Sequence, residues 1–163
     1  EGILKLGDVL SKVYEGIAEA DEGPELSFCP NTGCADAEAY CRLLRESRAR
    51  DQLIGATQRG PHRDDFNFSL HVGGAREYAS DGQQRGLCVA LRVAQASLYS
   101  ELLNLVPVLL ADDVLGELDP IRRVGFWQTC PKEMQIIATG TELPAEPKKW
   151  AIYNVKNGHV LCP

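Results

Sequence analysis

Two apolar segments separated by a helical pattern constrain the fold of this chain more than any other feature. Residues 106–111 (VPVLLA) and 134–139 (MQIIAT) are continuous apolar runs. Their length and their content of Val, Leu and Ile are typical of strands that are buried on both faces of a parallel sheet. A helix is expected to begin between them, near Pro120. This alternation of strand, helix and strand indicates an α/β domain.

The remaining elements follow from periodicity, composition and turn residues. Apolar spacing or helix-forming composition predicts three further helices, over residues 3–17, 35–49 and 83–103. Other segments predict a short strand at 26–29, an alternating strand at 66–72, a tight turn at Gly73-Gly74 with a return strand at 75–78, and a terminal hairpin around Asn157-Gly158. We therefore divide the chain into a small helical lobe, residues 1–50, followed by an α/β domain, residues 51–163.

Adjacent acids follow the first apolar strand in the segment "LLADDVLGELD". Carboxylates beside a core strand are costly unless something offsets their charge, and a bound cation does so. Mg²⁺ prefers one or two carboxylates together with water and phosphate oxygens. Asp112 and Asp113 therefore form a candidate magnesium and catalytic pair. The pattern alone is equally compatible with two acids that begin a solvated loop.

A second candidate site is the turn "YASDGQQRG", which leads directly into the helix predicted at 83–103. Helix starts bind anions because free backbone N–H groups point outward at the positive end of the helix dipole. The lysine of a phosphate loop is missing from this turn. The dipeptide Gly-Lys, which the G-x-x-x-x-G-K-[ST] loop requires, occurs nowhere in the chain.

The segments "GPHRDDF", "SDGQQR" and "LLADDVLGELD", in this order, resemble the C-terminal half of the RecF family, the bacterial DNA repair ATPases of the ABC/SMC-like head group. The resemblance spans roughly residues 50–143, and the segment before it is compatible with it. It implies the C-terminal half of a P-loop NTPase, an ABC-type ATPase head, with the helical lobe in front. No single segment is specific, but the combination is.

The resemblance also implies roles for particular residues. Ser80, Asp81, Gly82 and Gln83 match the signature loop, which faces the γ-phosphate of ATP held by another subunit. Asp112 matches the Walker B acid near Mg²⁺. Asp113 matches the position of the catalytic acid, where the wider ABC family usually has Glu.

Two further matches concern the subunit interface and the switch region. Asp119 matches the D-loop, which lies across the dimer interface in such heads. Thr139 and Thr141 fall where ABC proteins usually carry a switch histidine. This departure is RecF-like, but it leaves the γ-phosphate sensor unassigned.

Because the P-loop is missing, we expect the chain to be a fragment that binds ATP weakly or not at all by itself. An exposed strand edge or apolar patch is expected where the other half of the sheet would pack. For the full protein the resemblance implies ATP and Mg²⁺ as cofactors, an ATP-dependent homodimer, DNA at gaps or duplex/single-strand junctions, and mediators of the RecR and RecO kind. The expected location is the bacterial cytoplasm, at the nucleoid, without a membrane.

Two alternatives remain open. The chain could be a non-catalytic interaction or regulatory module that kept the head fold and lost ATP chemistry. It could also derive from another SMC-like head, such as a nuclease ATPase of the overcoming-lysogenization-defect type; "GPHRDDF" favours the RecF family. The loop holding "GPHRDDF" is expected either near the nucleotide or dimer interface, or in a purely structural place.

The charge balance argues against a protein coated in positive charge, because the formal net charge is −6. Six arginines nevertheless gather between residues 42 and 63. They are either a solvated helix face with the loop after it, or a contact to the DNA backbone through Arg42, Arg45 and Arg48. Cys29, Cys34 and Cys41 lack a fourth ligand at zinc-site spacing.

Overall fold

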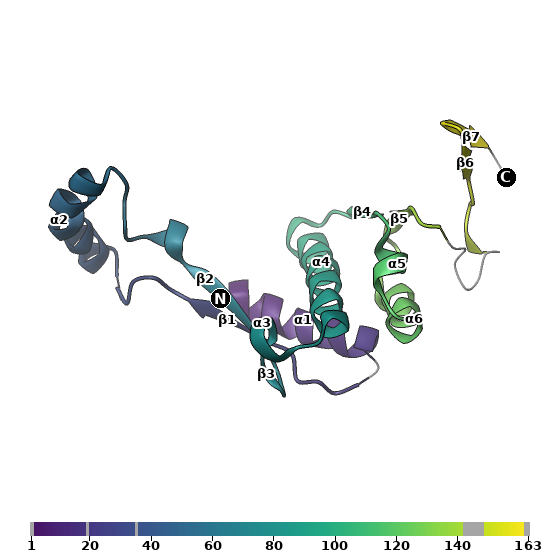
Figure 1. Cartoon of the computed structure of the whole chain (residues 1–163), viewed down its shortest axis with the longest axis horizontal. Helices are drawn as coiled ribbons and strands as arrows, with labels where there is room; N and C mark the ends of the chain where they lie inside the picture. Colours follow the sequence, from purple (N-terminus) through teal and green to yellow (C-terminus); the bar gives the residue numbers. More distant parts are fainter. Residues whose placement is uncertain (1, 19, 35, 142–148, 162–163) are drawn as a thin grey trace.

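The computed structural model describes residues 2–18, 20–34, 36–141 and 149–161 and is elongated. Figure 1 shows helix α2 (Ala37–Ile54) at one end and the hairpin of β6 (Asn154–Lys156) and β7 (His159–Leu161) at the other. Between them lie the other long helices and a small parallel sheet. The chain therefore has a packed centre with an extension on each side.

The centre is built by α1 (Gly2–Ala18), α4 (Asp81–Leu103) and α6 (Pro120–Thr129). Helix α1 packs against both of the others, and its apolar stripe of Leu10, Tyr14 and Ile17 is fully buried. From α4 the core receives Val93 and Ala94, among others. The helices predicted at 3–17 and 83–103 are confirmed. Neighbouring elements cover the long apolar stripe of each helix.

A two-stranded parallel sheet lies against this centre. Strand β4 (Val108–Ala111) pairs in parallel with β5 (Gln135–Ala138), so that Leu109 lies opposite Ile136. These two side chains pack against the core. The parallel strands predicted from the apolar runs are thus confirmed.

Burial on both faces of this sheet is not found. Side chains on its second face are exposed, by 51% at Val108, 72% at Leu110 and 51% at Ile137. The sequence predicts such an exposed apolar patch where the other half of the sheet would pack. No helix in the described part of the chain is both long and apolar enough to cross a membrane.

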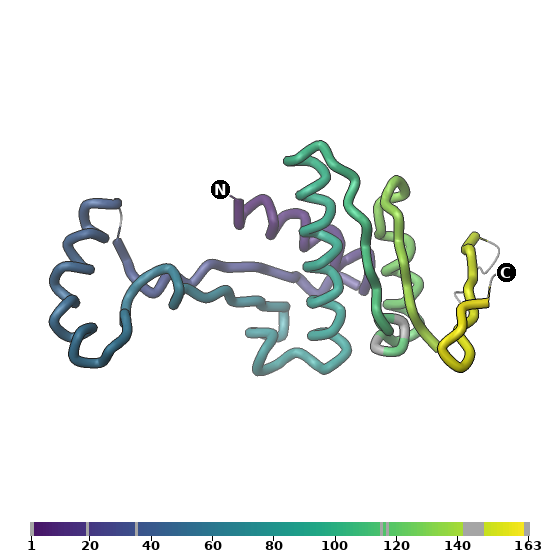
Figure 2. Tube along the Cα trace, turned by 90° about the horizontal axis from the view of Figure 1, so that it is seen from above, coloured from purple at the N-terminus to yellow at the C-terminus, as the bar shows by residue number. Residues whose placement is uncertain are grey.

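An antiparallel arm carries α2 away from the centre. It consists of β1 (Glu25–Cys29) and β2 (Asp65–Leu70), which pair with Phe28 opposite Phe66, and it runs between α2 and the three central helices (Figure 2). Helix α2 is capped by Asp36, whose carboxylate accepts the backbone N–H of Ala39 at 2.8 Å. None of the residues of α2 is buried, so its stability depends on capping and propensity more than on packing.

Residues 1–50 do not form one packed lobe in this arrangement. The boundary at residue 50 falls inside α2, and α1 belongs to the centre with α4 and α6. The physical reason is the apolar stripe of α1, which needs both helices to be covered. Sequence periodicity identifies such a stripe but not the element that covers it.

The tight turn predicted at Gly73-Gly74 is wrong by two residues. Strand β2 turns at His71 and Val72, and Gly73–Gly74 is the short strand β3 that pairs back on Leu70. Residues Ala75–Tyr78 form the helical turn α3 instead of a return strand. Gly73 has φ +119°, and a Cβ there would lie 2.8 Å from the Tyr78 ring. The positive φ therefore favours glycine at this position.

At the other end of the chain the predicted terminal hairpin is confirmed. Asn157 (φ 51°) and Gly158 (φ 78°) join β6 to β7. Two successive positive φ angles are what a two-residue hairpin turn of this hand needs. Trp150 precedes the hairpin and contacts the ring of Trp127 in α6, with 4.7 Å between ring centroids.

Candidate functional site

The two acids lie where the parallel strands end, as the sequence predicted. Strand β4 ends at Ala111, and Thr139 follows the end of β5. The Thr139 hydroxyl donates to Asp112 Oδ1 at 2.5 Å and accepts the backbone N–H of Asp113 at 3.1 Å. One threonine therefore connects both acids, and the first of the two predicted switch residues lies beside them.

Asp113 has an unusual backbone that turns it away from the strand direction. Its φ is 52°, and it begins the single helical turn α5 (Val114–Glu117). A Cβ on Gly116 would lie 3.1 Å from Asp113 Oδ1, so the glycine makes room for the carboxylate. Positive φ is rare for residues with a side chain, although Asp tolerates it better than most. Both acids are exposed.

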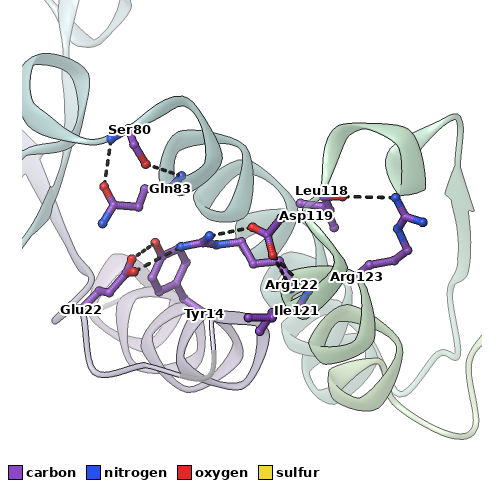
Figure 3. Close-up of polar contacts among 9 residues, drawn as sticks. All are labelled: Tyr14, Glu22, Ser80, Gln83, Leu118, Asp119, Ile121, Arg122 and Arg123. Carbon is purple, nitrogen blue, oxygen red and sulfur yellow. Dashed lines mark hydrogen bonds and ion pairs between the residues drawn. The ribbon is translucent and has the colours of Figure 1, made fainter.

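The residues Ser80 to Gln83 start helix α4 and form a complete capping box (Figure 3). Ser80 Oγ accepts the backbone N–H of Gln83 at 3.3 Å, and Gln83 Oε1 accepts the backbone N–H of Ser80 at 2.9 Å. The N–H groups of Asp81 and Gly82 belong to the first turn, which has no earlier helical carbonyl to bond. The Ser80 hydroxyl also keeps its own proton available for donation.

Asp119 caps helix α6 and is held in place by several donors. Its Oδ1 accepts the backbone N–H groups of Ile121 at 3.1 Å and Arg122 at 3.0 Å, and its Oδ2 pairs with Arg122 Nη1 at 2.7 Å. The backbone N–H of Arg122, followed by the guanidinium, holds the pKa of Asp119 below its ordinary value. The carboxylate is therefore ionised at neutral pH.

Arg122 is the functional candidate that sequence reasoning missed. Besides Asp119 it pairs with Glu22 through Nη2 at 3.2 Å, and the hydroxyl of Tyr14 also donates to Glu22. Figure 3 shows the guanidinium between Asp119 on one side and Tyr14 with Glu22 on the other. Burial acts to lower the pKa of Arg122, but the interactions with Asp119, Tyr14 and Glu22 together outweigh it, and the net shift is upward. A signal existed in the sequence, since Arg follows the capping Asp by three residues.

Other predicted site residues lie away from this cluster. Thr141 is exposed beyond β5. Arg42, Arg45 and Arg48 are exposed on α2, at the far end of the arm from the signature turn and the acids (Figure 1). They cannot take part in chemistry at Asp112 and can act only as a separate surface of the same subunit.

The loop "GPHRDDF" is hydrogen-bonded to the segments just before and just after α2. Asp64 Oδ1 accepts the backbone N–H of Asn31 at 2.8 Å, and the side chain of Asn31 accepts from Gly60 at 3.3 Å. Arg63 donates to Gln58 Oε1 at 3.2 Å. These contacts favour the structural role for this loop over a place near the nucleotide or dimer interface.

The described residues form no metal site from protein ligands alone. Among the described residues, no three His, Cys, Asp or Glu side chains lie close enough together to hold an ion. The acid pair nevertheless fits Mg²⁺, since this ion needs only one or two carboxylates when phosphate oxygens and water complete its shell. Thr139 engages one oxygen of Asp112, and the carboxylate has a second one for a cation.

Comparison with known proteins identifies the family. No family model matches the chain. RecF, the DNA replication and repair protein, of Moorella thermoacetica is 40% identical over 127 residues, which is 78% of this chain and 34% of that protein. RecF of Heliobacterium modesticaldum is 31% identical over 170 residues, covering 98% of this chain and 46% of that protein. The chain belongs to the RecF family.

A solved structure agrees with this assignment. The structure of the recombination mediator protein RecF with ATP in the RecFOR pathway superimposes with a TM-score of 0.76 at 25% identity, over 99% of this chain and 44% of that one. The chain spans between about a third and a half of the length of the RecF proteins it matches, and it corresponds to their C-terminal part. The predicted fold class, part of an ABC-type P-loop ATPase head, is confirmed.

Proposed function

We propose that this chain is the C-terminal part of an ATPase head that acts in recombinational DNA repair by ATP-dependent dimerisation on DNA. The observation that carries the proposal is the bond from Thr139 to Asp112 at the ends of two parallel strands, in a chain of which 99% matches RecF with ATP. Asp112 would hold Mg²⁺ and Asp113 would accept a proton from the attacking water. In phosphoryl transfer, positioning and charge stabilisation supply most of the rate enhancement.

The signature residues act on a nucleotide held by a second subunit. Ser80 donates its hydroxyl proton to a γ-phosphate oxygen while its oxygen continues to cap α4. The N–H groups of Asp81 and Gly82 add two donors at the positive end of the helix dipole. Gln83 keeps Ser80 in this rotamer through its side-chain bond. Asp119 lies in the D-loop, at the same subunit interface.

The RecF relatives also support a proposal for the wider biological setting. The partners proposed are DNA at gaps or duplex/single-strand junctions, a second copy of the same head, and mediators of the RecO and RecR kind, as in the RecFOR pathway named for the solved structure. The setting is the bacterial cytoplasm, beside the nucleoid and in the response to DNA damage. ATP serves as a clamp for the dimer more than as fast fuel, as in other SMC-like heads.

A non-catalytic regulatory module is the second candidate, since the chain contains no Gly-Lys dipeptide. The gene sequence upstream of Glu1 separates the two. A G-x-x-x-x-G-K-[ST] loop within a few hundred residues supports the ATPase, and its absence supports the module. Calorimetry on the 163 residues alone is expected to give little or no Mg²⁺-dependent ATP binding.

Mixed dimers test the action of the signature loop in trans. Ser80→Asp keeps a good helix cap but places a negative charge against the γ-phosphate. It is combined with a second full-length subunit whose P-loop lysine is replaced. Each variant alone is expected to be inactive, whereas an equal mixture regains about a quarter of the wild-type ATPase rate, since half of the dimers are mixed and each has one intact site of two.

The control for this test is Ser80→Thr, which keeps both the cap and the hydroxyl and retains the wild-type rate. Activity that does not return in the mixture, although the mixed dimer forms, would contradict action in trans. Full activity of Ser80→Asp alone would remove Ser80 from the site.

The arginines of α2 are proposed to contact the DNA backbone. Phosphate contacts make affinity depend on salt, and each lost contact lowers the slope of log affinity against log salt by about 1. Arg45→Glu with Arg48→Glu in the full-length protein is therefore expected to lower that slope by about 2 or more. Fluorescence anisotropy with gapped DNA measures it. Arg92→Glu, an exposed arginine on α4 that bonds Gln95, is the control. Unchanged affinity of the α2 variant at low salt would exclude the contact.

A further inference from the structure

One side chain joins three segments that are far apart in the sequence. Arg122 in α6 pairs with Asp119 three residues before it and with Glu22, which is 100 residues away. Glu22 lies in the connection between α1 and the arm strand β1. The side chain of Arg122 is only 17% exposed, and that of Glu22 is 20% exposed. Pairs as sheltered as these are screened by water and salt much less than surface pairs are.

The same guanidinium lies against the glycines of the signature helix. A Cβ on Gly82 would lie 3.7 Å from Arg122 Nη1, and a Cβ on Gly86 would lie 3.3 Å from Arg122 Nε and 3.4 Å from the Tyr14 ring. The first two turns of α4 thus pack on Arg122 and Tyr14 through two glycines, Gly82 and Gly86. Arg122 Nε is buried against Gly86 and has no hydrogen-bond partner among the described residues.

We propose that Arg122 is a positioning residue that couples the D-loop to the signature turn and to the connection before β1, where the arm begins. The proposal rests on the proposed function, in which Asp119 and Ser80 to Gln83 act at the same subunit interface. Arg122 contacts Asp119 directly and the helix of the signature turn at Gly82 and Gly86. A shift of the D-loop on dimerisation moves the guanidinium, and with it the surface on which α4 rests. Glu22 passes the same shift to β1 and the arm.

Hydrogen exchange tests this coupling without nucleotide. In the full-length protein, Arg122→Gln and Asp119→Asn are expected to speed the exchange of the backbone amides at residues 82–87 about tenfold, since each variant removes a charge-assisted bond. Asn at 119 still accepts the N–H groups that cap α6, so helix α6 itself remains. Arg92→Gln on the exposed side of α4 is the control and is expected to leave these amides unchanged.

Nucleotide binding provides the readout that a merely structural role would not move. Arg122→Gln is expected to bind ATP within about twofold of the wild type but to weaken ATP-dependent dimerisation about tenfold or more. Arg122→Lys, which keeps the charge but not the two-pronged geometry, is expected to restore part of the dimer. Sedimentation with and without ATP measures dimerisation, and a fluorescent ATP analogue measures binding.

The outcomes separate this inference from the proposed function. If the wild type neither binds ATP nor dimerises, the proposed function fails and the hydrogen-exchange result alone decides on the coupling. If exchange at residues 82–87 is unchanged in Arg122→Gln and Asp119→Asn, the coupling is excluded. A parallel loss of melting temperature and ATP affinity in both variants would also overturn it. If Arg122→Gln does not fold, Glu22→Gln and Asp119→Asn carry the same test.

Discussion

Replacement of Gly125 by alanine is expected to lower the free energy of unfolding by about 3 kcal/mol or more, which is at the upper end of overpacking effects. Gly125 is buried in α6 where this helix crosses α1. An added Cβ would lie 2.5 Å from the carbonyl oxygen of Gly16 and 2.6 Å from that of Ile17. Both neighbours are backbone atoms of a helix, so neither can move aside as a flexible side chain would.

Urea unfolding followed by circular dichroism measures this effect. Gly7→Ala is the matched control, because Gly7 lies in α1 and a Cβ there would find its nearest atoms at 3.8 Å and 3.9 Å. That change is expected to stabilise the protein by up to about 1 kcal/mol, since alanine favours a helix over glycine. An unfolding midpoint for Gly125→Ala equal to that of the wild type would show that α1 and α6 do not cross as closely as described.

Local patterns predicted the elements that carry the candidate site. The apolar runs before Asp112 and through residue 139 gave strands of the right type and order, and the turn before residue 83 gave a capped helix start. Such features depend on a few neighbouring residues, namely an apolar run, a capping Ser and a following Gln. The contact of Thr139 with Asp112 also follows from local rules, because parallel strands end at the same edge of a sheet.

Features that depend on distant packing could not be predicted in the same way. Periodicity showed the apolar stripe of α1 but not that α4 and α6 cover it, and this is why residues 1–50 were assigned to a lobe of their own. The turn at His71 and Val72 was missed because the two glycines pair with Leu70 and Ser69 of β2, and no local pattern shows this pairing. The bond between Arg122 and Glu22 joins residues 100 positions apart, and no local pattern contains it.

Asp113→Asn in the full-length protein is expected to lower the ATPase rate by about 10²- to 10⁴-fold, the usual contribution of a general base. Asparagine has nearly the same shape, and it also tolerates the positive φ of 52° found here. The backbone N–H that bonds Thr139 is unchanged. The variant therefore loses the proton acceptor and little else, so ATP binding and the ATP-dependent dimer are expected to persist and the dimer to live longer.

Phosphate release under saturating ATP measures the ATPase rate, and sedimentation measures the dimer. Asp112→Asn provides the contrast, since loss of the proposed Mg²⁺ ligand is expected to weaken Mg²⁺-dependent ATP binding together with dimerisation. Asp8→Asn, an exposed acid on α1, controls for the change in charge. An Asp113→Asn protein that hydrolyses ATP at the wild-type rate would assign the proton acceptor to another group. Because Thr139 bonds the Asp112 carboxylate and the Asp113 backbone, Thr139→Val would then show whether these two bonds are needed for catalysis.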